Sequence, residues 1–228
     1  MKLFRTVLLT SGLVLALSSG AAQTQLSAQD TPASRAASKP MVTLQMPALP
    51  APVPVTLNPK TTALLVFDYV EPICNSKSKC GRELLPALTA FMARSRKAGL
   101  VVAYGTREEN VSKWLPEVAP QPGDITIVTI GQDRFYNTDL DKDLKAKGIT
   151  TTIMAGWKVS GSVAYSSVGA TLRGYTVVVP VDTTGATADY EQVIGFFNIL
   201  NQINGNLPNQ PLKPNAPTLS RTDMITFQ

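Results

Sequence analysis

The feature that most constrains the fold is a regular alternation of strand-like and helix-like segments between residues 61 and 204. Short runs of apolar residues alternate with amphipathic segments whose apolar side chains recur three or four positions apart. Chains of this kind form right-handed βαβ units, which build a parallel sheet with helices on both faces. The alternation therefore predicts an α/β fold, a three-layer α/β/α sandwich around a six-stranded, mostly parallel, Rossmann-like sheet.

Six strands and four helices are expected. The apolar runs predict strands over residues 61–68, 100–106, 124–130, 149–154 and 175–182, with a short last strand within 218–227. The amphipathic segments predict helices over residues 82–99, 137–148, 163–174 and 188–203. The chain from residue 61 onward is long enough to bury one sizeable core, so a single domain over residues 61–228 is expected.

The first 60 residues have a different composition. Lys2 and Arg5 precede an apolar run, and small residues follow it up to Ala22. This order predicts a signal peptide over residues 1–22 and an exported protein, periplasmic or secreted, with an uncleaved anchor as the alternative. The run is short, so no stable membrane span is expected after cleavage. Residues 23–60 are rich in Pro, Ala and Ser and predict a linker whose last part lies along the domain.

The chain contains no histidine. Catalysis by Ser-His-Asp or Cys-His groups and the zinc protease helix motif all need an imidazole, so these classes are excluded. Cys74 and Cys80 are the only cysteines. Two thiols without an imidazole make a poor metal site, and neither a metal nor a cofactor is expected. In an exported protein this pair predicts a disulfide that closes a small loop and contributes roughly 2 kcal/mol.

The charge gives a weak indication of the binding partner. The formal net charge is +5, and loss of the first 22 residues would lower it by two because they contain Lys2 and Arg5 and no acid. No basic run or aromatic-basic interleaving is present, which argues against nucleic acid. We expect a small-molecule substrate, with an anionic group as one option. Assembly into a homo-oligomer remains open.

Polar residues follow the predicted strands at the sheet edge where ligands bind in parallel α/β proteins. Asp68 ends the first apolar run and is a candidate acid/base, or a simple loop cap. Ser162 begins the helix after the fourth run, where following N–H groups could hold an oxyanion; a plain helix cap is the alternative. Lys158 or Asp68 would have to serve as its base. Arg107 could bind an anion or pair with a neighbouring glutamate.

The segment "ALLVFDYVEPIC" (residues 63–74) and residues 135–182 resemble the isochorismatase-like hydrolase family, also called the cysteine hydrolase superfamily. The resemblance covers about residues 61–204. Its most specific positions are Phe135, Thr138, Asp139, Leu140, Gly148, Gly156 and Asp182. It implies a six-stranded parallel sheet between helices and a cis peptide near Lys158–Val159.

The resemblance also implies a catalytic aspartate, lysine and cysteine. Asp68 matches the aspartate, whereas Thr129 lies nearest to the lysine position and Ser162 occupies the cysteine position. Two of the three groups are therefore replaced. Lys158 or Arg134 could bring a cation into the space of the missing lysine. Trp157 is a candidate pocket wall, with core packing as the alternative.

Two branches of the family suggest different reactions. In the amidase branch the cysteine forms an acyl intermediate while the aspartate takes its proton, and a serine would react far more slowly. In the isochorismatase branch the aspartate delivers a proton to an enol ether and no cysteine is needed. The expected function is thus an exported hydrolase of a small amide or enol ether. The alternative is an inactive relative that binds a small molecule or a protein partner.

Overall fold

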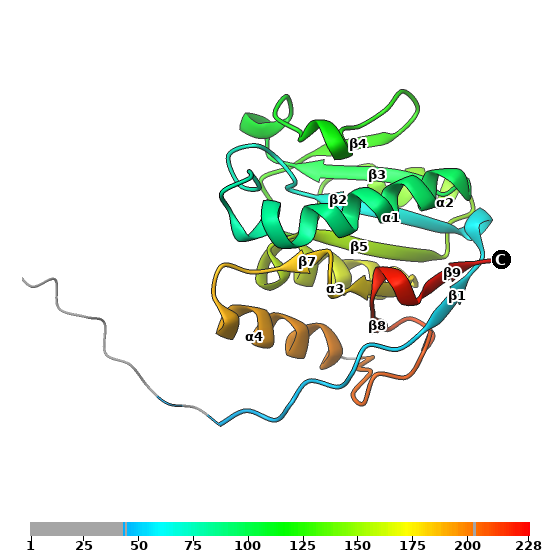
Figure 1. Cartoon of the computed structure of the whole chain (residues 1–228). Helices are drawn as coiled ribbons and strands as arrows, with labels where there is room; N and C mark the ends of the chain where they lie inside the picture. The colour runs from blue at the N-terminus through cyan, green and yellow to red at the C-terminus, as the bar shows by residue number, and fades with distance from the viewer. Residues whose placement is uncertain (1–42, 44, 203) are drawn as a thin grey trace, which may run out of the picture. The chain divides into compact units, whose positions relative to one another are not determined.

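The computed structural model describes residues 43, 45–202 and 204–228. A parallel sheet runs through the compact unit Pro47–Gln228 in the order β4-β3-β2-β5-β6-β8 (Figure 1). Its strands are β2 (Thr62–Phe67), β3 (Val101–Thr106), β4 (Ile125–Val128), β5 (Thr151–Trp157), β6 (Thr176–Pro180) and β8 (Pro217–Ser220). The two-residue strand β7 (Thr184–Gly185) pairs with β5 off this path. The predicted six-stranded parallel sheet is confirmed, with β7 as an addition.

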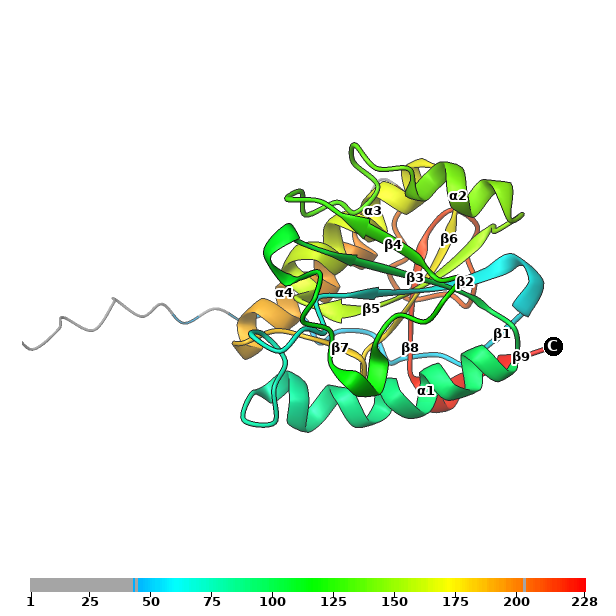
Figure 2. The same cartoon turned by 90° about the horizontal axis from the view of Figure 1, so that it is seen from above.

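Helices cover both faces of the sheet (Figure 2). They are α1 (Leu85–Lys97), α2 (Leu140–Ala146), α3 (Ala164–Leu172) and α4 (Asp189–Leu200). Side chains of β2 alternate between the faces, as strand geometry requires. Leu64 and Val66 pack with residues of α1, whereas Leu65 and Phe67 pack with residues of α2, α3 and α4. The three-layer sandwich expected from the sequence is therefore present.

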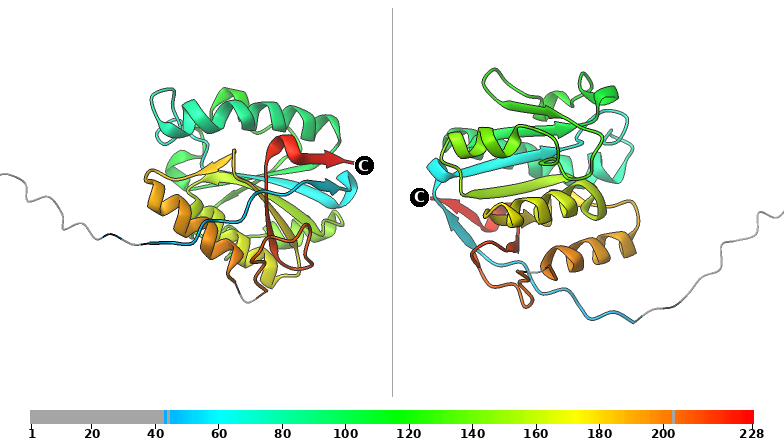
Figure 3. Two further views of the ribbon diagram at one scale, coloured as in Figure 1. Left: turned by 60° about the horizontal axis from the view of Figure 1, so that its bottom comes forward. Right: turned by 180° about the vertical axis from the view of Figure 1, so that it is seen from behind.

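Residues that precede the main-sheet strands in the sequence pair with residues that follow them, beside the main sheet. Strand β1 (Val55–Leu57) pairs in parallel with β9 (Ile225–Phe227), as Figure 3 shows. The backbone of Val53 also donates to Leu219 O in β8. The expected linker region therefore includes chain that packs on the domain, and the compact unit begins at Pro47 rather than at residue 61.

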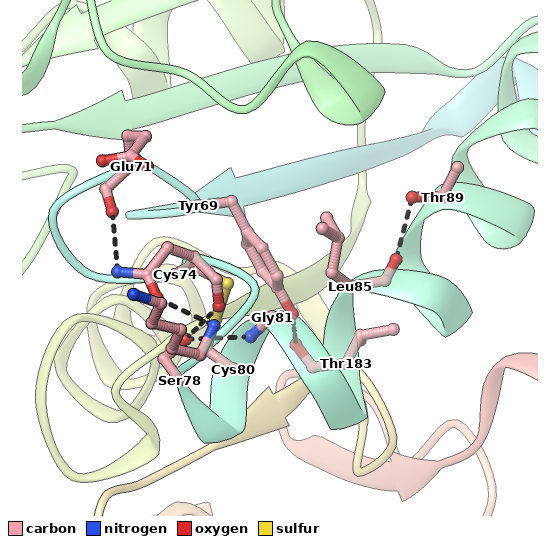
Figure 4. Close-up of a disulfide and its surroundings, with 11 residues drawn as sticks. Tyr69, Glu71, Cys74, Ser78, Cys80, Gly81, Leu85, Thr89 and Thr183 are labelled. Atoms are coloured by element: carbon pink, nitrogen blue, oxygen red, sulfur yellow. Dashed lines mark hydrogen bonds between the residues drawn. A yellow bond between two sulfur atoms is a disulfide. The ribbon is translucent and has the colours of Figure 1, made fainter.

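A disulfide joins Cys74 and Cys80 in the loop between β2 and α1 (Figure 4). Both cysteines are fully buried, and the expected pairing is present. The helical turn η2 (Cys80–Leu84) follows and leads into α1. Tyr69, at the start of the loop, donates its hydroxyl to Thr183 O at 2.9 Å. The loop after β2 is thus anchored near its start by Tyr69 and closed on itself by the disulfide.

The main difference from the predicted elements is at β5. The apolar run predicts a strand ending at residue 154, but β5 continues to Trp157. The extra residues pair with β7, because Gly156 and Trp157 lie opposite Thr184 and Gly185. No alternation of apolar and polar residues in the sequence predicts this extension. It forms because β7, which is distant in the sequence, pairs with it. The extension carries the following turn to the edge of the sheet.

Candidate functional site

The candidate site lies where strands β2 and β5 pair in the middle of the sheet. Chain connections leave β2 and β5 toward opposite sides, because β3 and β4 lie on one flank and β6 and β8 on the other. Such a reversal in strand order opens a crevice at the carboxyl ends of the strands. Asp68 directly follows β2, and Ser162 lies in the helical turn η5 (Val159–Val163) after β5. The fold therefore brings both predicted residues to one place.

Three donors converge on the carboxylate of Asp68, which is 6% exposed. Ser162 Oγ donates to Oδ2 at 3.0 Å, and Arg134 donates an NH2 hydrogen to the same oxygen at 2.6 Å. Thr106 Oγ1 donates to Oδ1 at 3.1 Å. The backbone of Asp68 has a φ of 59°, a conformation that is uncommon for residues other than glycine. Asp68 is thus held by three side chains, and two of them, Ser162 and Arg134, bond to the same oxygen.

Arg134 supplies the cation that the sequence left unassigned. Its side chain comes from the loop after β4 and is 4% exposed in its ion pair with Asp68. The NH1 group donates to Thr129 O and to Gly131 O, each at 3.1 Å. Its Nε is buried and has no partner among the described residues. A guanidinium keeps its proton under all ordinary conditions, so Arg134 can neutralise charge but cannot act as an acid.

The turn that carries Ser162 is tightly folded. A cis peptide joins Trp157 to Lys158, one bond earlier than expected. Gly161 interrupts the helical turn with a φ of −121° and a ψ of −114°. The N–H groups of Gly161 and Val163 donate to Lys158 O, at 3.1 and 3.2 Å. The N–H group of Val163 is therefore engaged within the turn, contrary to the expectation that it would help to hold an oxyanion.

A pocket of about 310 Å³ opens onto Asp68 and Ser162. Its other lining residues include Ile73, Arg107, Ile130, Gln132, Trp157 and Lys158. A cavity of about 400 Å³ lies elsewhere, between residues 49–52 and helix α4, and is mainly apolar. We assign function to the smaller pocket because only that one contains the converging polar groups.

Lys158 does not reach Asp68 or Ser162. Its Nζ donates to Glu191 Oε1 in α4 at 2.7 Å, so the proposed role as base of Ser162 lacks a contact. The Lys158 side chain is also 39% exposed. Hydrogen bonding from Lys158 is the main cause that lowers the pKa of Glu191. Lys158 is therefore an element of the pocket rim.

The other predicted binding residues differ in their placement. Arg107 lines the pocket mouth, and its Nε pairs with Glu109 at 3.0 Å in an exposed ion pair. Trp157 forms part of the pocket wall, which is one of the two placements expected for it. Thr129 contributes its carbonyl oxygen to Arg134, and its Oγ1 accepts from the backbone of Gly131. Thr129 thus holds Arg134 and does not line the pocket.

Sequence reasoning missed several contributors, among them Thr106, Ile73, Ile130 and Gln132. Thr106 ends β3 beside Asp68, and its position after an apolar run was the available signal. Ile73 and Gln132 reach the pocket from loops, for which periodicity carries no information. No group of three or more His, Cys, Asp or Glu residues that could hold a metal ion occurs in the described part of the chain.

Within the described ranges, no helix combines the length and apolarity needed to cross a membrane.

Comparisons with known proteins agree with the fold. The isochorismatase domain matches residues 62–205. The chain is 30% identical over 116 residues to the ureidoacrylate amidohydrolase RutB of Stutzerimonas stutzeri (strain A1501), across 50% of this chain and 45% of that protein. It is 25% identical to the RutB of Caulobacter segnis over 207 residues, across 68% of this chain and 85% of the relative. The match to the first relative spans less than half of its length.

Two solved structures share the architecture. A cysteine hydrolase from Pseudomonas syringae pv. phaseolicola 1448A superposes with a TM-score of 0.61 at 18% identity, covering 79% of this chain and 95% of that chain. An N-carbamoylsarcosine amidase from Thermoplasma acidophilum superposes with a TM-score of 0.58 at 21% identity, covering 72% and 97%. At these identities the likeness describes the fold alone.

Proposed function

The chain belongs to the isochorismatase-like hydrolase family, and on this premise we propose that it hydrolyses an amide bond of a small substrate, with Asp68 as base and Ser162 as nucleophile. The observation that carries the proposal is the 3.0 Å hydrogen bond from Ser162 Oγ to Asp68 Oδ2 beside a pocket. Relatives named as ureidoacrylate amidohydrolases and a structural neighbour named as an N-carbamoylsarcosine amidase support the choice of an amide.

The reaction would follow the usual course of nucleophilic acyl transfer. Asp68 takes the proton of Ser162 as Oγ attacks the substrate carbonyl, and the same proton passes to the leaving nitrogen as the C–N bond breaks. A water molecule then attacks the acyl ester, gives a proton to Asp68, and the proton returns to Oγ as the ester bond breaks. A serine hydroxyl has a much higher pKa than a thiol, so turnover is expected to be slow.

The arrangement around Asp68 favours amide hydrolysis over enol-ether hydrolysis. An enol ether must receive a proton from Asp68, whereas the amide route begins with Asp68 as an acceptor. Three donors already point to this carboxylate, from Ser162, Arg134 and Thr106. Arg134 would balance the negative charge near the reacting atoms without giving up a proton.

The pocket rim supports an anionic group on the substrate. Arg107 and Lys158 both line the pocket, although each pairs with a glutamate at its outer side. The Arg107–Glu109 pair is exposed, and exposed ion pairs typically contribute less than about 1 kcal/mol, so a substrate carboxylate could compete with Glu109 for Arg107.

A second candidate function is binding without catalysis. The buried ion pair between Asp68 and Arg134 favours it, because a carboxylate shared between a guanidinium and a hydroxyl is also a stable structural arrangement. The positions of the family lysine and cysteine are occupied by Thr129 and Ser162, which removes the groups that perform thiol chemistry.

Turnover by matched variants distinguishes the two functions. We expect the protein to hydrolyse at least one compound in a panel of ureido acids, carbamoyl amino acids and primary amides, and expect Asp68→Asn and Ser162→Ala each to lower kcat by about a hundredfold or more. Asp223→Asn is the control, because that carboxylate is 67% exposed and lies in the turn before β9, outside the pocket lining. Binding of a panel compound without turnover would favour the second function, and hydrolysis of enol ethers alone would reassign Asp68 as an acid.

Export remains part of the proposal. The buried disulfide between Cys74 and Cys80 is the kind of bond that persists in oxidising compartments. Mass spectrometry of protein from the periplasm or medium is expected to show a chain that starts close to residue 23. An intact chain in the membrane fraction would instead indicate an uncleaved anchor.

A further inference from the structure

Ser166 connects helix α3 to the loop that carries Arg134. The backbone N–H of Arg134 donates to Ser166 Oγ at 3.0 Å, and the Ser166 hydroxyl donates to Gln132 O at 3.4 Å. Ser166 is fully buried. Because it lies four residues after Ser162, it is about one helical turn further along the same segment.

A second contact holds the same loop on α3. The Asp133 carboxylate accepts the N–H of Phe135 at 2.9 Å and lies directly against Gly169 of α3. A Cβ atom at Gly169 would come within 2.4 Å of Asp133 Oδ1. Arg173, at the end of α3, approaches the same carboxylate at 3.6 Å. The Asp133 side chain, next to Arg134, therefore rests on this helix.

We propose that Ser166 is a positioning residue for the site: it fixes the backbone of Arg134 so that the guanidinium meets the carboxylate of Asp68. Helix α3 then holds both partners of Asp68, with Ser162 just before its start and Arg134 through Ser166. This inference rests on the proposed hydrolase function for its effect on rate, but not for its effect on the geometry of Arg134.

The neighbouring Ser167 provides a matched control. Ser166 and Ser167 are adjacent, both are fully buried, and both lie on α3. Ser167 Oγ has no hydrogen-bond partner among the described residues. Replacing either serine by alanine removes one buried hydroxyl from the same helix, but only Ser166→Ala removes a bond to the Arg134 backbone.

The first test compares rates. Ser166→Ala should lower kcat/KM about tenfold or more, since small displacements of catalytic groups are costly, and Ser167→Ala should change it less than about twofold. In an Arg134→Ala background, Ser166→Ala should have little further effect on the rate, because the guanidinium that it positions is already gone. Equal losses for the two serine variants, or an undiminished loss in the Arg134→Ala background, would overturn the proposal.

The second test needs no turnover. Phenylglyoxal modifies accessible arginines, and peptide mass spectrometry gives the rate at each one. Arg134 is 3% exposed, whereas the side chain of Arg107 is 56% exposed and serves as the internal reference. Arg134 should react at least several-fold faster in Ser166→Ala than in the unaltered protein or in Ser167→Ala.

The two tests separate failure of this proposal from failure of the hydrolase proposal. Faster modification of Arg134 in Ser166→Ala, in a protein that hydrolyses nothing, would support the positioning role and reject the hydrolase function. Unchanged protection of Arg134 in Ser166→Ala would reject the positioning role, whatever the activity.

Discussion

The Asp68–Arg134 ion pair places opposite charges 2.6 Å apart with almost no access to solvent. A buried ion pair contributes little beyond an apolar substitute, but removal of one partner leaves an unpaired buried charge. The pair is therefore a point at which single substitutions should have large effects. Both residues also take part in the proposed chemistry, so stability and activity must be measured separately.

Arg134→Ala should lower the free energy of unfolding by about 3–5 kcal/mol, because it leaves the Asp68 carboxylate buried without its cation. Urea denaturation measures this change. Arg107→Ala is the control, since its exposed pair with Glu109 should contribute less than about 1 kcal/mol. Adding Asp68→Asn to Arg134→Ala should recover part of the loss. A loss below about 1 kcal/mol for Arg134→Ala would show that the carboxylate is effectively solvated.

Ionisation of the Tyr104 hydroxyl should make the protein less stable in alkali. Burial raises the pKa of Tyr104 from 10.0 to about 12, with a smaller opposing effect from Arg96. The native state therefore keeps this proton to higher pH than the unfolded state, and the free energy of unfolding should fall as pH rises from about 10 to about 12. Denaturation midpoints across this range measure the fall.

Tyr104→Phe should reduce that pH dependence without abolishing it. Burial also raises the pKa of Tyr69 and Tyr175, so both contribute a fall of the same sign. An identical pH dependence in the Tyr104→Phe variant would contradict the assignment.

At the scale of elements, helix α4 supports the turn that carries Ser162. Gly195 lets the helix approach so closely that a Cβ there would lie 2.9 Å from Val159 Cγ1 and 3.0 Å from Ser160 N. Alanine ordinarily stabilises a helix relative to glycine by about 0.5–1 kcal/mol. Gly195→Ala should do the opposite here, because the backbone of the turn must shift.

Unfolding and kinetics together test this role of α4. Gly195→Ala should lower both the free energy of unfolding and kcat/KM. Ile194→Ala, at a 38% exposed position on the same helix, should leave kcat/KM within about twofold. A stabilised and fully active Gly195→Ala protein would mean that the turn adapts without cost.

The loop between β2 and α1 depends on its disulfide. A variant with Cys74→Ala and Cys80→Ala should lose about 2 kcal/mol of unfolding free energy, because the unfolded chain gains freedom when the ring opens. Ile73, next to Cys74, lines the pocket, so KM should rise more than kcat falls. Equal stability of the double variant and the unaltered protein, measured by thermal unfolding, would contradict the loop-closure argument.

At the scale of the whole molecule, the chain before residue 61 completes the core. Val55 and Leu57 of β1 are each 4% exposed and belong to the core cluster on the α1 side. A chain starting at Asn58 should be less stable than one starting at Pro47 by about 3–6 kcal/mol, from the loss of two buried side chains. Chemical denaturation of the two chains measures the difference. Equal stability would show that β9 closes the core without β1.

Much of the fold follows from local sequence patterns. Apolar runs and amphipathic segments predict strands and helices, and the handedness and pairing rules of βαβ units then leave few arrangements. The extension of β5 to Trp157 and the pairing of β1 with β9 lie outside those rules. Both depend on partners that are distant in the sequence, so no local period encodes them.

Local sequence patterns already indicate that a carboxylate and a hydroxyl meet at one sheet edge, because Asp68 and Ser162 each follow an apolar strand and parallel strands end together. Which cation joins them depends instead on the packing of the folded chain. Arg134 rather than Lys158 contacts Asp68, since α3 holds the backbone of one and Glu191 of α4 holds the side chain of the other. The direction of a long side chain depends on the packing of loops and helices around it, and a linear pattern does not specify that packing.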